Sequence, residues 1–379
     1  CEANAALDEG RVGDRGHAGL RALMDEVDAH LDVIGADEPG LVAHDYPVGT
    51  TPPRAGAALR PVGAGDGADL ESLARPGSVR ITKLVTALFA YLQIALGGLV
   101  RVSGSGLGCP DWPLCNGRPY PPANVHSIIE YSHRAVGSVT GILIIATVVM
   151  AWVVFRKRRP LVAWLATASL IGVVGEGILG GIVVAKELSP WLVVVHLGLA
   201  MIILGFLVAA AVTAMPSSDG VSDLNFRRLA IIGAAATYVM MLTGSTVVAS
   251  GADESCHSWP LCGGGFAFDF SGVNAYTMLH RGSVFVVGLL LLHILSKALM
   301  RFRDVRGMRL VSGVAIGALV LQIGVGAGSA VGGGAPFDGL HVAIASLVWS
   351  SVLATALLTL PRKDRNVALS RLEVDRTSA

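Results

Sequence analysis

Eight long apolar segments constrain the fold of this chain more than any other feature of its sequence. They cover approximately residues 81–102, 128–155, 161–184, 190–214, 228–250, 276–299, 308–331 and 338–360. About 20 helical residues cross a hydrocarbon core ~30 Å thick. Only 15% of the residues are charged, against roughly a quarter in a soluble domain. We therefore predict an all-α integral membrane protein with eight transmembrane helices.

Residues 1–78 differ from the rest of the chain. They contain 14 of the 28 acidic residues but only six arginines and no lysine. Low hydrophobicity combined with net charge favours disorder, so we predict an acidic, disordered extension. No signal peptide precedes the first apolar segment, and this segment is therefore expected to target the protein to the membrane.

Basic residues gather in alternate links between the apolar segments. The run 156–159 follows the second segment, Arg227 and Arg228 follow the fourth, and four arginines lie within 301–309 after the sixth. The intervening links contain almost no Lys or Arg. Because cytoplasmic loops carry the positive excess, we expect a multi-pass cell-membrane protein with both termini, including the tail 363–379, in the cytoplasm.

The chain contains an internal repeat. Cys109 and Cys115 enclose Trp-Pro-Leu in the first half, and Cys256 and Cys262 enclose the same tripeptide in the second. The repeat divides the membrane domain into residues 79–215 and 216–362, with four apolar segments each. Since four is an even number, we predict two four-helix bundles that are parallel repeats about an axis near the membrane normal.

Both cysteine pairs are predicted to lie on the outer side, where disulfides persist. Their spacing suits disulfides that close short loops, and it differs from the Cys-x-x-Cys-His motif of covalent heme attachment. Such a bond can be a structural staple or can exchange electrons or thiols. The sequence leaves both roles open.

Four histidines recur in the same order in the two halves. His133 and His280 follow the cysteine loops at an offset of 147, and His196 and His341 lie on the last segment of each half. One isolated histidine would suit helix–helix hydrogen bonding, but intramembrane ionisable groups generally mark functional sites. Paired imidazoles are a standard set of axial ligands for heme iron. A zinc site is disfavoured, because two histidines without a nearby carboxylate or thiolate fall short of four ligands.

Glu130 distinguishes the first half from the second. It precedes His133 by three residues and shares its side of the helix, whereas the matching residue of the second half is Thr277. A buried carboxylate could accept or deliver a proton, and we predict a catalytic role. The alternatives are a residue that orients an imidazole and a carboxylate at the water interface. Arg134 and Arg281 are candidates for pairing with heme propionates.

Together these features resemble the heme A synthase family. The resemblance rests on Glu-x-x-His-Arg in the second segment, His-Arg in the sixth, single histidines in the fourth and eighth, and paired cysteines in outer loops. It covers roughly residues 81–360. It implies an oxidoreductase that converts a methyl group of heme O into the formyl group of heme A by successive hydroxylations and loss of water, for use by terminal oxidases.

The resemblance also implies roles for particular residues and partners. His133 and His196 would hold the substrate heme O, and His280 and His341 would hold a heme b cofactor. Glu130 would be the essential acid, and the first cysteine pair would be functionally important. Heme O synthase would be the donor of substrate and terminal oxidase assembly the acceptor of product, with membrane lipid around the protein, no nucleic acid partner, and a homo-oligomer compatible with the sequence.

Two other functions fit parts of the pattern. A diheme b-type cytochrome that takes electrons from quinol would explain four histidines, but it would not explain why only one half carries a carboxylate. A transporter would explain the repeat and the glycine-rich segments, and it would bind no heme.

Overall fold

The structure, a computed structural model, describes residues 76–264 and 266–363. These residues form eight helices, α3 (Pro76–Val102), α4 (Val125–Phe155), α5 (Pro160–Ala185), α6 (Pro190–Thr213), α7 (Leu224–Ala249), α8 (Asn274–Arg301), α9 (Met308–Ala330) and α10 (Ala335–Leu358). All eight are long and apolar enough to cross a membrane. Within the described ranges the connections contain no β-strand, only isolated bridges. The predicted all-α membrane fold with eight spans is confirmed.

Two predicted segments fall outside these ranges. The extension 1–78, apart from its last three residues, and the tail 363–379, apart from Lys363, lie outside the described residues. All eight helices belong to one compact unit, residues 63–379. The division of the membrane domain at residues 215 and 216 therefore stays a prediction.

Local sequence explains where several helices begin. The side chain of Asn124 caps α4 by accepting hydrogen bonds from the backbone N–H groups of His126 and Ser127. Asp223 caps α7 in the same way. The helices α5 and α6 each begin with a proline, whose missing N–H costs nothing at the first helical position. These signals separate apolar segments that would otherwise run closely together.

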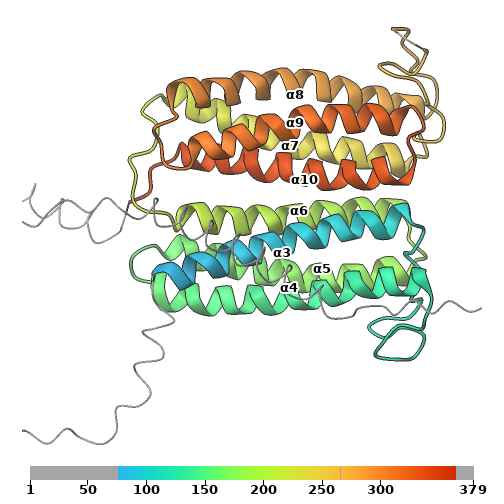
Figure 1. Ribbon diagram of the computed structural model, residues 1–379, viewed down its shortest axis with the longest axis horizontal. Coiled ribbons are helices and arrows are strands. Elements are labelled where there is room, and N and C mark those ends of the chain that lie inside the picture. Colours follow the sequence, from blue (N-terminus) through green and yellow to red (C-terminus); the bar gives the residue numbers. More distant parts are fainter. Residues whose placement is uncertain (1–75, 265, 364–379) are drawn as a thin grey trace, which may run out of the picture. The chain divides into compact units, whose positions relative to one another are not determined.

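The helices pack as two sets of four (Figure 1). In the first set, consecutive helices pack against each other and α3 also contacts α6. In the second set, α7 to α10 pack consecutively and α10 contacts α7. Helix α10 also contacts α3 and α6, and α6 contacts α7. The parallel-repeat relationship between the two sets stays a prediction.

Aromatic residues join the two sets at their interface. The indole Nε1 of Trp349 donates a hydrogen bond to the carbonyl oxygen of Met201 at 3.1 Å. The Tyr238 hydroxyl donates to the carbonyl oxygen of Gly198, also at 3.1 Å, and the Tyr238 and Trp349 rings lie 5.5 Å apart. Each polar tip therefore finds a backbone partner inside an apolar interface, as buried Tyr and Trp usually require.

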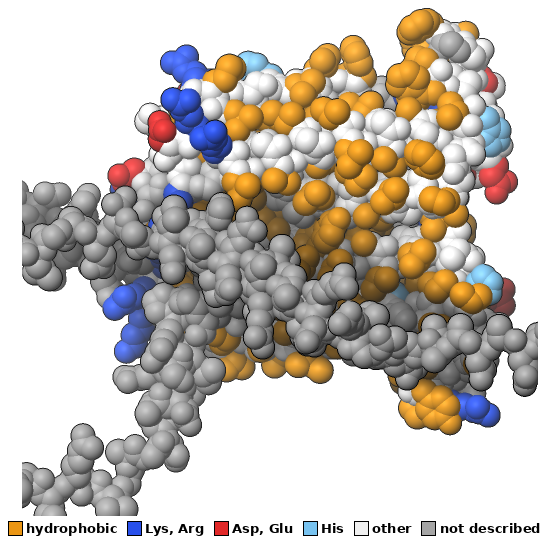
Figure 2. Space-filling view, viewed as in Figure 1, with side chains coloured by type: hydrophobic (Ala, Val, Ile, Leu, Met, Phe, Trp, Pro, Cys, Tyr) orange, Lys and Arg blue, Asp and Glu red, His pale blue; other side chains and the backbone are white. Residues whose placement is uncertain are grey.

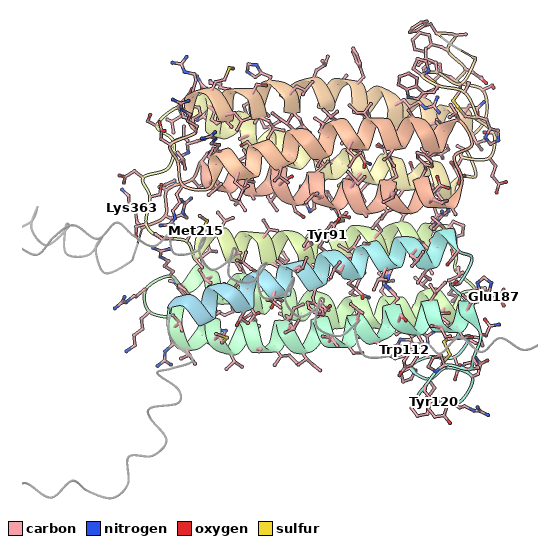
Figure 3. The ribbon with its side chains drawn as sticks, in the orientation of Figure 1. Tyr91, Trp112, Tyr120, Glu187, Met215 and Lys363 are labelled. Carbon is pink, nitrogen blue, oxygen red and sulfur yellow. A yellow bond between two sulfur atoms is a disulfide. The ribbon has the colours of Figure 1, made fainter. Side chains whose placement is uncertain are left out.

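Apolar side chains also cover the outer surface of the helices (Figure 2). Ile142, Ile171 and Leu310 are 66%, 70% and 72% exposed, which suits contact with lipid tails rather than water. Met215 and Lys363 lie at one end of the helices, whereas Trp112 and Tyr120 lie in the first cysteine loop at the other end (Figure 3). The predicted cytoplasmic and outer sides of these ends stay predictions.

Candidate functional site

The four predicted histidines lie in two pairs, one in each set of helices. His133 on α4 and His196 on α6 are near enough to interact electrostatically. His280 on α8 and His341 on α10 form the corresponding pair in the second set. All four side chains are partly buried. The structure therefore places the two histidines of each half close together, on alternate helices of each set.

Each imidazole lies against a glycine of a neighbouring helix. A Cβ atom added to that glycine would lie close to Cε1 of the ring, at 3.1 Å for Gly97 and His133, 3.3 Å for Gly180 and His196, 2.9 Å for Gly244 and His280, and 2.8 Å for Gly326 and His341. Distances under about 3.4 Å are tighter than ordinary carbon contacts. The four glycines therefore provide the space in which the rings lie.

A polar side chain four residues before the glycine faces the histidine in the first set. Nε2 of Gln93, on α3, lies 3.3 Å from Nε2 of His133. On α5, Oε1 of Glu176 lies 3.1 Å from Nδ1 of His196. Residues four apart share one face of a helix. On each of these two helices, the glycine and the polar residue therefore face the same imidazole ring.

The second set repeats this arrangement with different chemistry. Nε2 of Gln322, on α9, lies 3.1 Å from Nδ1 of His341 and 3.2 Å from Nε2. On α7 the corresponding position is Met240, and the polar contact to His280 comes instead from the Thr243 hydroxyl, 3.1 Å from Nδ1. The two halves therefore share the contact between histidine and glycine, but the polar side chains that contact the histidines differ.

Sequence reasoning missed these partners and glycines. They were detectable, because Gln93 and Met240 are 147 residues apart and Glu176 and Gln322 are 146 apart, close to the offsets of the histidines. The expectation that no carboxylate lies near the histidines was wrong for the first set, since Glu176 comes from the preceding helix. Even so, no group of three or more His, Cys, Asp or Glu side chains in the described ranges could hold a metal ion.

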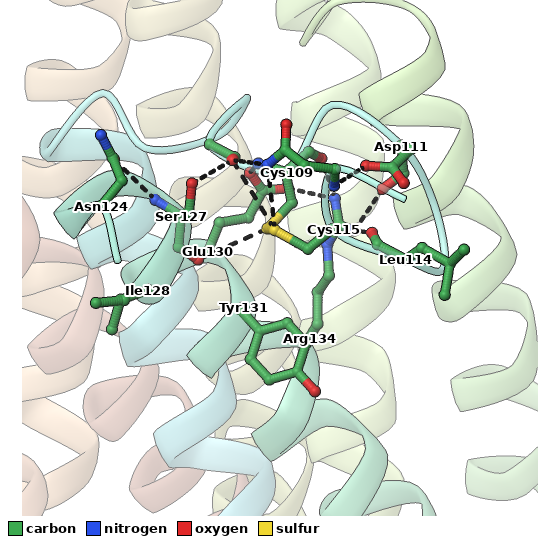
Figure 4. Close-up of a disulfide and its surroundings, with 12 residues drawn as sticks. Cys109, Asp111, Leu114, Cys115, Asn124, Ser127, Ile128, Glu130, Tyr131 and Arg134 are labelled. Carbon is green, nitrogen blue, oxygen red and sulfur yellow. Dashed lines mark hydrogen bonds and ion pairs between the residues drawn. A yellow bond between two sulfur atoms is a disulfide. The ribbon is translucent and has the colours of Figure 1, made fainter. Parts of the chain in front are cut away.

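Glu130 is buried at the start of α4, where it binds the first cysteine loop (Figure 4). The side chain is 3% exposed. Its Oε2 accepts a hydrogen bond from the backbone N–H of Cys109 at 2.7 Å, and its Oε1 pairs with Nη2 of Arg134 at 2.5 Å. The catalytic role of Glu130 and its two alternatives stay predictions. Glu130 ties the loop to the helix that carries His133.

Arg134 holds the same loop through its carbonyl groups. Nη1 donates to the carbonyl oxygens of Asp111 and Leu114, each at 2.6 Å, and Nη2 donates to that of Cys109 at 2.5 Å. Charged hydrogen bonds of this kind are roughly twice as strong as neutral ones. These bonds engage the guanidinium group, and its pairing with a heme propionate stays a prediction.

Arg281 plays a similar part in the second set without a carboxylate. Its Nη1 donates to the carbonyl oxygens of Ser258 and Pro260, at 2.7 and 3.1 Å. Thr277, which corresponds to Glu130, contacts only the carbonyl oxygen of Ala252, at 3.5 Å. The pairing of Arg281 with a propionate also stays a prediction, and the loops of the two halves are anchored unequally.

Both cysteine pairs lie at disulfide distance. The sulfur atoms of Cys109 and Cys115 are 2.01 Å apart, and those of Cys256 and Cys262 are 2.13 Å apart. Both cysteines of the first pair are fully buried. Inside this loop, the Asp111 carboxylate accepts hydrogen bonds from backbone N–H groups. These bonds lower the pKa of the carboxyl, and the bond from Gly117 has the largest effect. Whether either disulfide is structural or redox-active stays open.

The arrangement of each pair fits a heme group. Two imidazoles on facing helices can bind an iron atom from opposite sides, and the notches left by glycines give the rings room to align. Nδ1 of His133 is buried without a hydrogen-bond partner among the described residues, and such a group calls for an explanation, for example a ligand or a water molecule. The glycine notches and paired rings occur twice, so two heme groups fit.

Comparison with known proteins gives a consistent picture. Residues 80–353 match the COX15-CtaA family, described as cytochrome oxidase assembly proteins. Over 232 residues the chain is 29% identical to the heme A synthase of Shouchella clausii, covering 59% of this chain and 77% of that protein. Over 240 residues it is 30% identical to the heme A synthase of Alkalihalophilus pseudofirmus, covering 60% and 79%. The heme A synthase of an Exiguobacterium species is 29% identical over 251 residues, covering 65% and 81%.

Proposed function

Because the chain belongs to the COX15-CtaA family of cytochrome oxidase assembly proteins, we propose that it is a heme A synthase that oxidises heme O. The reaction converts a methyl group into a formyl group through two hydroxylations and loss of water. The observation that carries the proposal is the inequality of the two sites. Both halves hold histidines against glycines. Among the described residues, a carboxylate at ion-pair distance from a histidine ring, Glu176, occurs in the first half, where Glu130 also stands at the position of Thr277.

The first half is the substrate site in this proposal. His133 and His196 hold heme O through its iron, and Gly97 and Gly180 leave the space that the two imidazoles need. Bound heme supplies the redox chemistry of its iron. The imidazoles on α4 and α6 would orient the group, because both helices pack against their neighbours in the first set.

Glu130 holds or transfers a proton at the outer end of this site. Its carboxylate lies between α4 and the loop that contains the first disulfide. A general acid or base must be held in a defined position near the reacting groups, and Arg134 with the Cys109 N–H provides that restraint. The anchored loop also covers the end of the helices, which limits access of water to the site.

The second half holds a heme b cofactor that passes electrons. His280 and His341 would hold this heme, and Gly244 and Gly326 leave room for their rings. No acidic side chain occupies the position of Thr277 in this half. A heme that only accepts and donates electrons requires no proton donor beside it, and this fits the presence of Thr277 where the first half has Glu130.

The proposal places the protein in the bacterial cell membrane. Its basic links and both termini face the cytoplasm, and both disulfide loops face outward. Heme O reaches the first half from heme O synthase, and the product heme A passes to the assembly of terminal oxidases. Lipid surrounds the exposed apolar side chains of the eight helices.

Heme analysis of purified protein tests this proposal. Wild-type protein made together with a source of heme O should contain heme b and yield heme A. We expect Glu130→Ala to keep heme b but to form no heme A. Thr277→Val, at the corresponding position of the second half, is the matched control and should form heme A normally.

Three results would contradict the proposal. Wild-type protein that binds two b-type hemes and never yields heme A would be a diheme cytochrome. Protein without a Soret absorbance band would favour a transporter. Normal heme A formation by Glu130→Ala would remove this carboxylate from the mechanism.

A further inference from the structure

We propose that Glu176 is a positioning residue that makes His196 a stronger electron donor to heme iron than its counterpart in the second half. Oε1 of its carboxylate lies 3.1 Å from Nδ1 of His196. The corresponding partner of His341 is the neutral amide of Gln322. The inference rests on the proposed function, because it requires that both histidines ligate heme.

The position of Glu176 leaves one nitrogen of His196 for iron. Oε1 of Glu176 lies 3.1 Å from Nδ1 of the ring, and the two side chains are only 14% and 26% exposed. When Nε2 binds iron, Nδ1 must carry the proton, so the group that faces Nδ1 must accept a hydrogen bond. A carboxylate is suited to this task, since it is an acceptor through both oxygens.

A carboxylate at this depth calls for an explanation. Glu176 lies in the middle of α5, and charged groups within membrane spans are costly and usually functional. Among the described residues, His196 is the one ion-pair partner of Glu176, and Oε2 of Glu176 and Nδ1 of His196 are both buried without a hydrogen bond. The carboxylate therefore serves no wider polar network in this part of the protein, and its contact with His196 is the interaction that accounts for it.

The second half provides an internal comparison. Gln322 lies on α9 four residues before Gly326, as Glu176 lies four residues before Gly180 on α5. Its Nε2 lies 3.1 Å from Nδ1 of His341. Whichever end of the amide faces the ring, the group is uncharged. The same Nε2 lies 3.2 Å from Nε2 of the ring and donates to the His341 carbonyl oxygen at 3.0 Å. Glu176 and Gln322 therefore occupy matching positions of the sequence repeat and differ by one carboxylate.

The opposite histidines do not remove this difference. His133 faces the amide of Gln93, and His280 faces the Thr243 hydroxyl. Both partners are neutral. Of these four contacts at hydrogen-bond distance from a histidine ring, only that of Glu176 involves a carboxylate. Asp338, one turn before His341, also acts on that histidine electrostatically, but its Oδ1 accepts a hydrogen bond from the Ser329 hydroxyl.

A carboxylate behind a ligating histidine changes the properties of the metal. It fixes the ring orientation and raises the basicity of the ligand. A more basic axial ligand stabilises oxidised iron relative to reduced iron and so lowers the reduction potential. We therefore expect the heme of the first half to have the lower potential because of Glu176, and the heme of the second half to have the higher potential.

A reciprocal exchange of the two residues tests the inference. Glu176→Gln and Gln322→Glu are purified with heme O supplied during expression, and the bound hemes are titrated at controlled potentials by absorbance. Glu176→Gln should raise the midpoint of one heme and leave the other unchanged. Gln322→Glu should lower the midpoint of the other heme. We expect at least a tenfold change in the ratio of oxidised to reduced iron, or about 59 mV for one electron.

The possible results separate this inference from the proposed function. Midpoints that stay at wild-type values in variants with both hemes bound overturn the inference, even if the wild type forms heme A. If Glu176→Gln does not fold or loses its heme, Gln322→Glu decides alone, and an unchanged midpoint in that variant overturns the inference. Wild-type protein that binds no heme overturns the proposed function and the inference with it.

Discussion

Replacement of Gly326 by alanine should weaken heme binding in the second half. The added Cβ would lie 2.8 Å from Cε1 of His341, whereas carbon atoms pack best at about 3.5–4.0 Å. The ring would have to retreat by roughly 0.7 Å, and metal–ligand distances vary by only about 0.2 Å. Overpacking of this kind costs roughly 1–3 kcal/mol. We therefore expect heme affinity to fall by a factor of about 5 to 150.

Gly324 offers a matched control on the same helix. A Cβ added there has no neighbouring atom within 4 Å. Both substitutions favour the helix, because alanine is about 0.8–1 kcal/mol better than glycine in a helix interior. Titration of heme into the heme-depleted variants, followed by Soret absorbance, measures the affinity. Gly324→Ala should bind as the wild type does.

Equal heme affinity in Gly326→Ala and Gly324→Ala would refute the reasoning. It would mean that the ring of His341 does not need the space that Gly326 leaves. A graded result would support it further. Gly180→Ala, whose Cβ would lie 3.3 Å from Cε1 of His196, should weaken binding less than Gly326→Ala.

Two further predictions concern the loops and the helix caps. Arg134→Gln removes the charged hydrogen bonds that hold the first disulfide loop, each worth about 1.5–3 kcal/mol. We expect dithiothreitol to reduce this disulfide at least tenfold faster in Arg134→Gln than in the wild type, as measured by thiol labelling. Equal reduction rates of the first disulfide in Arg134→Gln and Arg281→Gln would contradict this expectation. The backbone N–H of Phe226 and the ammonium of Lys297 lower the pKa of Asp223, so its contribution to stability is present at neutral pH and lost as the pH falls below about 4. Asp223→Ala should lower the melting temperature by a few degrees at pH 7 and have little effect at pH 3, and an equal effect at both values would contradict this assignment.

Much of the fold could be predicted because membrane helices are encoded locally. A run of about 20 apolar residues suffices to define a span, and the predicted spans agree with the eight helices to within a few residues. The histidines were also predictable, since the internal repeat singles out four of them by order and offset. Their pairing in space follows from the equivalent places of α4 and α8, and of α6 and α10.

The polar partners of the histidines were harder to predict. Gln93, Glu176 and Gln322 lie on helices other than those of the rings that they face. Which residues of one helix face a neighbour depends on how both helices are rotated in the packed bundle. Hydrophobic segments that are apolar on all sides carry little information about that rotation.

The sequence by itself determined that this protein has eight membrane helices, two histidines in each half, and a carboxylate, Glu130, in only one half. Only the tertiary structure decided that Arg134 binds carbonyl groups of the first cysteine loop, and that Glu176 lies 3.1 Å from the ring of His196. Length and hydrophobicity are properties of single segments, so they can be read along the chain. Contacts between helices depend on the packing of the whole bundle, in which side chains 19 or more residues apart in the sequence lie next to each other.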